Sequence, residues 1–427
     1  MTQMLEARKG HITEEMEKVA AIEGVTPEFV REGVATGRIV IPKNKYRNRE
    51  KICGIGTGLD VKVNGLMGTS SDRNDMEMEA KKLRLMEECG ANAFMDLSTG
   101  DDIDAMRKQS LEISNIAAGC VPVYQASVEA IAKHGSMVAM TEDELFDTVE
   151  KQCQEGMDFM AIHSALNWSV INALQKTGRV SDVVSRGGSF LTAWMFHNQK
   201  ENPLYEHFDR LLEILKATDT VLSIGDAIRP GANADSLDAA QVQGLIVAGE
   251  LSKRALEAGV QVMIEGPGHV PLNQIATTMQ LQKQLCHGVP YYILGFLATD
   301  VAPGYDNITG AIGGAFAGMH GADFLCYLTP AEHLGLPTED DVRVGVRTTR
   351  IAADAANVLR RGGNAWNRSL AMAKARVARD TDAQIKNALD PEALAARMAK
   401  EPESHGCAAC GQSKCPADVA AEFFGIN

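Results

Sequence analysis

Three cysteines stand close together near the C-terminus, in the segment Cys407-Ala-Ala-Cys410-Gly-Gln-Ser-Lys-Cys415. Proline and glycine punctuate this region, so packing in a core does not explain the spacing. Three thiolates without a firm fourth ligand suit a 4Fe-4S cluster whose remaining iron is open to an exchangeable ligand. Such a cluster can bind and reduce S-adenosylmethionine. The alternative is a structural zinc knuckle completed by His405. The other cysteines are dispersed and are predicted to be buried thiols: Cys53, Cys89, Cys120, Cys153, Cys286 and Cys326.

Further polar residues recur directly after short apolar runs in the middle of the chain. They are Asp96, Ser98, Tyr124, His163, Ser185, Arg186, Asp226, Arg229, Glu265, His269, Tyr292, Thr329 and His333. Taken singly, Ser98 or Thr329 is explained equally well as a helix N-cap. As a set, these side chains provide the charged and hydrogen-bonding groups that a polar, anionic ligand requires.

Two smaller patterns indicate more specific chemistry. Ser185, Arg186 and Gly187 combine backbone N–H groups with a guanidinium, which suits a phosphate, although the motif alone is weak. His269 and His333 could share a divalent metal with open positions for substrate or water. For an arbitrary pair of histidines, however, structural roles are the more common.

The elements that would position these residues form a regular repeat. Apolar runs rich in β-forming residues alternate with stretches of helical spacing, such as Phe208, Leu211 and Leu215. The eight candidate strands are residues 93–97, 121–124, 159–163, 183–185, 221–225, 260–264, 291–295 and 324–328. Eight strand–helix units in about 250 residues favour an α/β fold of the closed (β/α)8 TIM-barrel type over an open sheet. The active site of such a barrel lies at the C-terminal ends of the strands, where the polar residues occur.

We expect four segments along the chain. Residues 1–75 form an N-terminal domain or lid, residues 76–338 the barrel, residues 339–390 C-terminal helices, and residues 391–427 the cluster-bearing tail. Residues 340–361 and 369–386 have the composition of long helices.

Composition excludes some classes of partner. With 56 acidic and 42 basic residues, the formal charge of -14 provides no basic footprint for nucleic acid. No run approaches the roughly 18 apolar residues of a membrane helix, and the first residues lack the apolar core of a signal peptide. The nine cysteines, an odd number, are predicted to be reduced and not to form a disulfide framework. We therefore expect a cytoplasmic protein that binds neither nucleic acid nor membranes.

Several motifs along the chain resemble those of a known family. They are Thr2-Gln3-Met4, Ala7-Arg8-Lys9-Gly10, Met95-Asp96-Leu97-Ser98, Val121-Pro122-Val123-Tyr124, Ser185-Arg186-Gly187-Gly188, Glu265-Gly266-Pro267-Gly268-His269 and Thr329-Pro330-Ala331-Glu332-His333-Leu334. Together with the C-terminal Cys-x-x-Cys-x-x-x-x-Cys pattern, they make essentially the whole chain similar to the radical S-adenosylmethionine family of the thiamin pyrimidine synthase.

This resemblance implies a substrate, cofactors and partners. The substrate would be 5-aminoimidazole ribotide. Its implied contacts are Met95, Tyr124, His163, Ser185, Arg186, Gly187, Asp226, Ala227, Ile228, Arg229, Glu265 and Tyr292. The resemblance also implies a divalent metal, zinc or iron, on His269 and His333, and S-adenosylmethionine with a 4Fe-4S cluster on Cys407, Cys410 and Cys415. A homodimer and an electron donor of the flavodoxin or ferredoxin type are implied as well. We assign the catalytic positioning or shuttling of protons to Glu265 and His163.

Two departures from the family pattern bear on the product. Pyrimidine-forming members usually have Asn-x-Asn-Ile/Leu-Gly where this chain has Asn64-Gly65-Leu66-Met67-Gly68, so Leu66 replaces a substrate-contacting asparagine. After His163, where a small residue and glycine are usual, the chain has Ser164-Ala165-Leu166-Asn167. A paralogous branch converts the same ribotide to 5-hydroxybenzimidazole, a precursor of the lower base of cobamides such as cobalamin. Losing one polar contact while keeping the phosphate, metal and cluster residues favours this branch. The alternative is phosphomethylpyrimidine synthase, which makes hydroxymethylpyrimidine phosphate for thiamin.

Two rival classes stay open from the residues alone. One is a zinc-dependent barrel hydrolase that uses His269 and His333, with the tail as a structural zinc site. The other is a nucleotide-binding sensor without turnover, in which the three thiols would have no evident purpose.

Overall fold

The computed structural model of the chain describes residues 2–361, 363–400 and 416–424. The chain forms two compact units, Met1–Ala356 and Asn357–Asn427. The predicted cluster ligands Cys407, Cys410 and Cys415, and His405 of the alternative zinc site, lie outside the described residues. Their roles therefore stay predictions.

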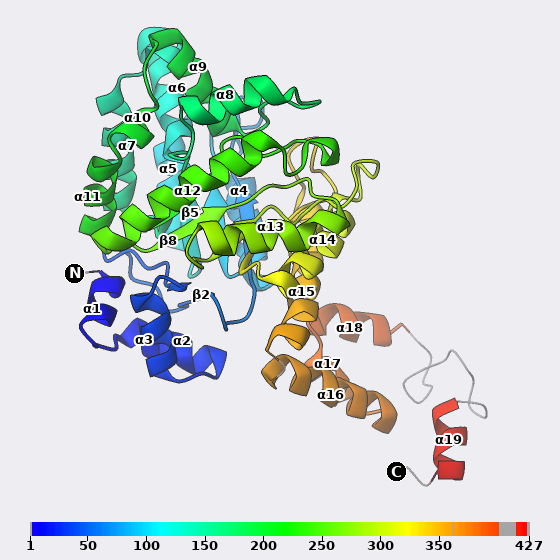
Figure 1. Cartoon of the computed structure of the whole chain (residues 1–427). Coiled ribbons are helices and arrows are strands. Elements are labelled where there is room, and N and C mark those ends of the chain that lie inside the picture. The colour runs from blue at the N-terminus through cyan, green and yellow to red at the C-terminus, as the bar shows by residue number, and fades with distance from the viewer. Residues whose placement is uncertain (1, 362, 401–415, 425–427) are drawn as a thin grey trace. The chain divides into compact units, whose positions relative to one another are not determined.

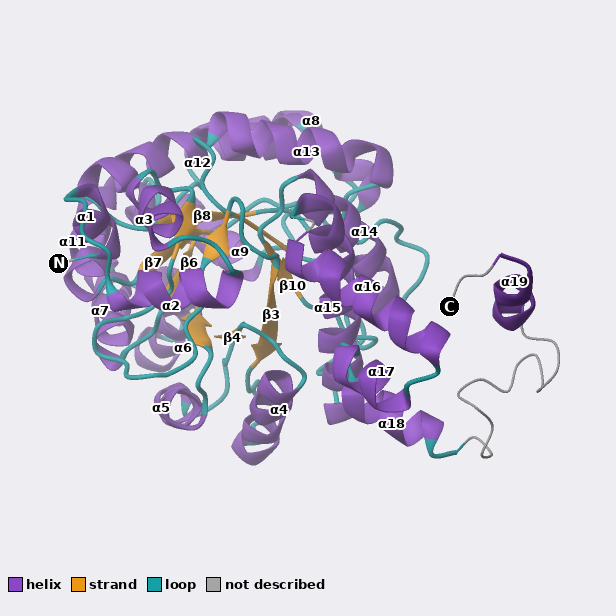
Figure 2. Ribbon diagram, turned by 90° about the horizontal axis from the view of Figure 1, so that it is seen from below, coloured by secondary structure: helices purple, strands orange, loops and turns teal. Residues whose placement is uncertain are grey.

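Eight parallel strands in the first unit close into a barrel. Their order is β3 to β10 in sequence, and β10 pairs with β3 to close the ring. Figures 1 and 2 show the strands at the centre with helices around them. The strands are β3 (Lys62–Met67), β4 (Ala93–Asp96), β5 (Ala117–Cys120), β6 (Phe159–Ile162), β7 (Val221–Ile224), β8 (Val262–Glu265), β9 (Tyr291–Ile293) and β10 (Phe324–Cys326). The predicted (β/α)8 TIM barrel is confirmed.

The helices between the strands begin and end at residues suited to helix caps. Helix α12 (Ala239–Ala258) begins after Asp238, whose side chain accepts a hydrogen bond from the N–H of Gln241, and ends at Gly259. Helix α7 (Glu142–Glu155) begins with a capping box between Thr141 and Glu144. The other helices from the barrel onward to residue 360 are α4 (Met76–Glu88), α5 (Ile103–Ile113), α6 (Pro122–His134), η1 (Met137–Ala139), α8 (Trp168–Thr177), α9 (Arg186–Asn198), α10 (Pro203–Glu206), α11 (Phe208–Thr218), η2 (Asn233–Asp235), α13 (Leu272–Leu285), α14 (Asp306–His320) and α15 (Glu339–Arg360).

Two of the eight predicted strands are wrong. One lies directly after β5, so that β5 was not predicted at its place; the other matches no strand of the barrel, and β3 has no prediction near it. Residues 121–124 lie mostly in α6, because Pro122 starts that helix directly after β5. Residues 183–185 form no strand, and Ser185 is instead the N-cap of α9. Strand β3 lies inside the segment 1–75. Its first residue, Lys62, looks like a surface residue but is buried against Glu23, with Nζ and Oε1 2.8 Å apart.

The N-terminal segment closes the bottom of the barrel. It contains α1 (Gln3–Arg8), α2 (Glu14–Glu23), α3 (Pro27–Ala35) and an antiparallel pair, β1 (Ile39–Val40) with β2 (Ile55–Gly56). Its contacts go to residues that directly precede strands: the N–H of Gln3 donates to Asp219, and that of Ile41 donates to Gln261. The elements from α1 to β2 therefore lie at the N-terminal ends of the strands, whereas residues 62–67 of the same segment form β3.

Asp158 anchors this segment to the barrel. Its carboxylate accepts from Arg47 at 2.5 Å and from the N–H groups of Asn44 and Ala118 at 2.9 Å, while Arg49 Nε lies 3.3 Å away. The Asp158 side chain is 0% exposed and that of Arg47 is 5% exposed. The carboxylate is thus the shared partner of two guanidinium groups that burial has removed from water.

Replacing Asp158 with alanine should lower the free energy of unfolding by about 3–5 kcal/mol, because it leaves buried positive charges without their partner. Chemical denaturation followed by circular dichroism measures this loss. Asp209→Ala is the control, since Asp209 pairs with Arg254 on the surface, where its side chain is 84% exposed, and should cost at most about 1 kcal/mol. Equal losses in the two variants would contradict the anchoring role.

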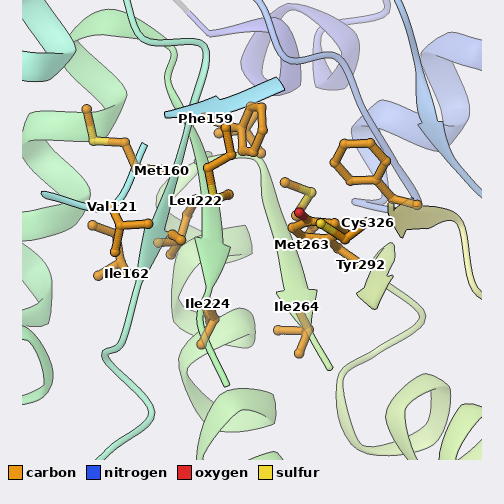
Figure 3. Packing of buried hydrophobic residues seen from close by; sticks show 14 of the residues in the cluster. Val121, Phe159, Met160, Ile162, Leu222, Ile224, Met263, Ile264, Tyr292 and Cys326 are labelled. Carbon is orange, nitrogen blue, oxygen red and sulfur yellow. The ribbon is translucent and has the colours of Figure 1, made fainter. Parts of the chain in front are cut away.

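The barrel interior is filled by large side chains that meet across strands. The ring of Phe324 lies 6.2 Å from that of Phe159 and 4.5 Å from that of Tyr292, measured between ring centroids. Figure 3 shows the packing around Phe159, with Leu222 on the neighbouring strand β7 and Met263 one strand further, on β8. Gly119 makes this possible, because a Cβ at this position would lie 2.3 Å from the Phe159 ring.

The second unit consists of helices. They are α16 (Gly363–Ala378), α17 (Thr381–Asn387), α18 (Pro391–Met398) and α19 (Pro416–Phe424). The predicted single helix over residues 369–386 is wrong, because Arg379, with a φ of 56°, separates α16 from α17. None of the helices in the described parts of the chain is long and apolar enough to cross a membrane.

Candidate active site

A cavity of about 90 Å³ lies at the C-terminal ends of the strands. Apolar side chains line most of it, and a few polar groups converge on it, as is usual for small-molecule sites. The lining residues are Leu66, Met95, Leu97, Val121, Tyr124, Ala161, His163, Arg229, Glu265, Gly266, Tyr292, Ile293, Leu294 and Cys326. Six of the predicted substrate contacts therefore share one cavity: Met95, Tyr124, His163, Arg229, Glu265 and Tyr292.

His163, directly after β6, is 3% exposed, and its Nδ1 has no hydrogen-bond partner among the described residues. Burial, together with the positive charge of Arg229, lowers the pKa of His163 to about 3. Gly187 packs against the ring so tightly that a Cβ there would lie 2.4 Å from His163 Cε1. The imidazole is thus neutral at physiological pH and can exchange hydrogen bonds but takes up a proton poorly.

Glu265, the last residue of β8, is the titratable acid of the cavity. Burial raises the pKa of Glu265 to about 7, against the opposing effects of a 2.9 Å hydrogen bond from Ser223 and of the nearby Arg229. Asp226 lies behind it, and burial raises the pKa of Asp226 to about 6, although Gln241 donates a hydrogen bond to its carboxylate. Glu265 can therefore both hold and release a proton near neutral pH.

Tyr292, Asn64 and Cys326 form a buried polar group on neighbouring strands. Asn64 Nδ2 donates to the Tyr292 hydroxyl at 2.8 Å and lies 3.8 Å from Cys326 Sγ. Burial raises the pKa of Cys326 to about 12, so the group is a thiol at neutral pH. Cys326 was predicted to be an ordinary buried thiol; it is buried, but it also lines the cavity.

The predicted phosphate motif lies at the N-terminus of a helix and not at the end of a strand. Ser185 caps α9, and Arg186 and Gly187 are the first two residues of that helix. The guanidinium of Arg186 stacks over the Tyr124 ring at 5.0 Å. Backbone N–H groups at a helix N-terminus favour anions, so this placement suits a phosphate better than the predicted strand end does. Ala227 and Ile228 are buried residues behind the first cavity, next to Asp226.

A second cavity of about 190 Å³ adjoins the first. The two share Leu66 and Leu97 in their walls. Its polar lining includes Arg186 and Glu332 and the buried ion pair between Glu79 and Lys82, with Oε1 and Nζ 2.6 Å apart. The barrel mouth thus has room for two small molecules side by side, with Leu66 between them.

The structure also brings His269 and His333 together, with their ring centroids 5.4 Å apart. Each ring has one nitrogen next to a carboxylate: Nδ1 of His269 lies 2.7 Å from Asp300, and Nδ1 of His333 lies 3.2 Å from Asp306. Imidazole nitrogens are suitable donors for zinc or iron. The donor set therefore fits a divalent metal.

Some residues of the site could not be found from the sequence. Leu97, Val121, Ala161, Ile293 and Leu294 are apolar cavity walls that look like any strand or helix residue. Asp300 and Asp306 follow no predicted strand directly, because a long loop separates them from β9.

The fold and the site together define a class: a (β/α)8-barrel enzyme whose mouth combines an anion-binding helix N-terminus, a titratable acid and a pair of imidazoles. Comparison with protein families narrows this class. The model of the Radical SAM ThiC family matches residues 2–422. The chain belongs to this family, which implies a 4Fe-4S cluster and S-adenosylmethionine as its cofactors.

Individual relatives divide into two groups by name. The chain is 91% identical over 426 residues to 5-hydroxybenzimidazole synthase BzaB of Eubacterium limosum, with 100% of both chains covered. It is 63% identical to 5-hydroxybenzimidazole synthase BzaB of Moorella thermoacetica, again with 100% of both chains covered. It is 53% identical to phosphomethylpyrimidine synthase of Desulforamulus reducens, with 100% of this chain and 99% of that protein covered.

Proposed function

We propose that this protein converts 5-aminoimidazole ribotide to 5-hydroxybenzimidazole for the lower ligand of cobamides. The observation that carries the proposal is the 91% identity, over the whole chain, to a 5-hydroxybenzimidazole synthase. Identity to a phosphomethylpyrimidine synthase is 53%. The first cavity is lined by 14 residues. A sequence divergence of this size can change several of them and so the product, whereas 91% identity leaves little room for such a change.

Leu66 supports the same choice. It lies on β3 beside Met95 of β4 and forms part of the wall between the two cavities. An asparagine amide at this position would hydrogen-bond a ligand in either cavity, whereas leucine presents only an apolar surface. The substrate would therefore be held and restrained differently during rearrangement.

The proposed roles follow from the positions of the side chains. The N-terminus of α9, with Arg186, would hold the ribotide phosphate, and Glu265 would accept or return a proton while neutral His163 orients the substrate. Cys407, Cys410 and Cys415 would hold the 4Fe-4S cluster, which with S-adenosylmethionine would supply radical chemistry for abstracting hydrogen from the substrate. The reaction as a whole would be a lyase-type rearrangement that breaks carbon–carbon bonds.

The proposal extends to partners. A small electron-transfer protein of the flavodoxin or ferredoxin type would reduce the cluster, and His269 with His333 would hold the divalent metal. We also propose a homodimer, which exposed apolar residues on α14 support: Ile308, Ile312 and Phe316 recur every four residues on one helix face.

The direct test is anaerobic incubation of the reconstituted protein with 5-aminoimidazole ribotide, S-adenosylmethionine and a reductant, followed by mass identification of the products. We expect 5-hydroxybenzimidazole and 5'-deoxyadenosine. Hydroxymethylpyrimidine phosphate would assign the protein to thiamin synthesis. No deoxyadenosine from a brown, cluster-loaded protein would contradict radical chemistry, and a colourless zinc protein would favour the hydrolase.

Leu66→Asn should lower the rate of 5-hydroxybenzimidazole formation about tenfold or more, because it places an amide without a matched partner at the substrate wall. Quantifying the benzimidazole and pyrimidine products by mass spectrometry measures the change. Leu66→Met keeps the wall apolar and similar in volume, and should stay within a factor of a few of the original rate. If both variants behave alike, Leu66 does not discriminate between products.

A further inference from the structure

Both imidazoles of the proposed metal site contact carboxylates that were not predicted from the sequence. Asp300 Oδ1 lies 2.7 Å from His269 Nδ1, and Asp306 Oδ1 lies 3.2 Å from His333 Nδ1. A carboxylate oxygen next to Nδ1 favours the ring tautomer whose proton is on Nδ1, because that N–H can donate to the oxygen. The lone pair is then on Nε2 of both rings, which is the form that binds a metal.

The carboxylates are themselves fixed by backbone groups. The second oxygen of Asp300 accepts from the N–H of Asn233 at 2.7 Å, and that of Asp306 accepts from the N–H of Gly304 at 3.2 Å. Asp306 is the first residue of α14 and is only 5% exposed. Each imidazole is therefore tied to a separate loop of the barrel mouth through a carboxylate that cannot swing freely.

His333 has a further constraint. Its φ of 63° lies in the left-handed region, where the side chain of a non-glycine residue is strained against the backbone. Such a conformation persists where surrounding contacts impose it, and the contact with Asp306 is one of them. The backbone at His333 is thus shaped to bring this ring next to His269.

Each carboxylate contacts the Nδ1 of its ring and one backbone N–H. Over residues 2–361, 363–400 and 416–424, no three His, Cys, Asp or Glu side chains gather so that they could hold a metal. A site with only two protein ligands gains little affinity from ligand number, so it depends strongly on having both rings in the right tautomer and orientation.

We infer that Asp300 and Asp306 are positioning residues that set the tautomer and orientation of His269 and His333 for one divalent metal. This inference rests on the proposed metal role of the two histidines. The remaining ligand positions stay available to substrate or water, which suits a metal that takes part in binding small molecules.

The test measures zinc affinity directly and does not depend on turnover. The full-length protein, with its cluster reconstituted so that the thiols of the tail are occupied, is dialysed anaerobically against chelator-buffered Zn²⁺, and bound zinc is determined by elemental analysis. Asp300→Ala and Asp306→Ala should each weaken zinc binding about 10- to 100-fold. Asp300→Asn and Asp306→Asn keep an oxygen acceptor next to Nδ1 and should recover part of the loss.

Two comparisons separate the possible failures. Glu142→Ala removes an exposed contact with His207, 3.0 Å long, that lies in no proposed site, and should leave zinc affinity unchanged. His269→Ala and His333→Ala should abolish the zinc site. If the histidine variants lose zinc but the aspartate variants bind it as the original protein does, the positioning role is wrong and the metal site stands. If the histidine variants also bind zinc normally, the metal site itself is wrong, and the positioning role with it. Thermal denaturation checks that every variant is folded.

Discussion

Replacing Cys407, Cys410 or Cys415 with alanine should reduce 5'-deoxyadenosine formation to the uncatalysed background. The family requires a 4Fe-4S cluster, and these are the three thiols with cluster spacing in the chain. The other six cysteines are buried and free. Burial raises the pKa of Cys153 to about 11 and that of Cys286 to about 12, so neither provides a thiolate readily. Iron content, the electron paramagnetic resonance signal of the reduced protein and deoxyadenosine yield measure the loss.

Two variants serve as controls for the cysteine series. Cys286→Ala removes a buried thiol at the end of α13 and should keep its iron and its deoxyadenosine yield. His405→Ala removes the fourth ligand of the alternative zinc knuckle and should also keep both. An alanine variant of any tail cysteine that retains a full cluster and normal cleavage of S-adenosylmethionine would overturn the assignment.

Glu265→Gln should lower the rate of benzimidazole formation by about 10²- to 10⁴-fold, the usual contribution of a positioned acid or base. With a pKa raised to about 7 by burial, Glu265 changes its charge where the enzyme works, whereas His163, with a pKa of about 3, stays neutral. We expect the ionised carboxylate to be the active form. The rate of the unaltered enzyme should therefore rise with pH through about 7, and the residual rate of the variant should lack this step.

The matched control for Glu265 is a carboxylate of similar pKa at the other end of the barrel. Burial also raises the pKa of Asp219 to about 7, but Asp219 binds the N–H of Gln3 at the N-terminal ends of the strands. Asp219→Asn should leave the pH dependence of turnover unchanged. Turnover is compared at equal amounts of reduced cluster, so that the pH dependence of the reductant does not enter. A step near pH 7 that survives in Glu265→Gln would exclude Glu265 as its source.

Melting temperatures test whether Glu265→Gln is folded. Because the pKa of Glu265 is higher in the folded chain than the usual 4.5, ionisation of this group destabilises the fold. The penalty is absent below about pH 4.5, grows as the pH rises, and is complete above about pH 7. The melting temperature of Glu265→Gln minus that of the unaltered protein should therefore be larger at pH 8 than at pH 5.

The sequence by itself determined the architecture and the kind of chemistry. The alternation of apolar runs with stretches of helical spacing predicted a closed barrel. This was possible because the spacing of apolar residues within each segment indicates whether the segment is a strand or a helix. The rule that the C-terminal ends of parallel strands meet on one side of a barrel predicted Tyr124, His163, Arg229, Glu265 and Tyr292 at one mouth, and the family resemblance added Met95. The spacing of the three tail cysteines predicts a 4Fe-4S cluster.

Tertiary structure decided what depends on partners distant in the chain. Strand β3 was missed because Lys62 is buried only through its pairing with Glu23. Strand β5 was misplaced because it contains Gly119, which fits there only because the Phe159 ring on β6 fills the space of a side chain. The same reason applies to the site. Leu66 forms part of the wall between two cavities, and Asp300 is the partner of His269. Both roles depend on residues distant in the chain, so the local sequence does not indicate them.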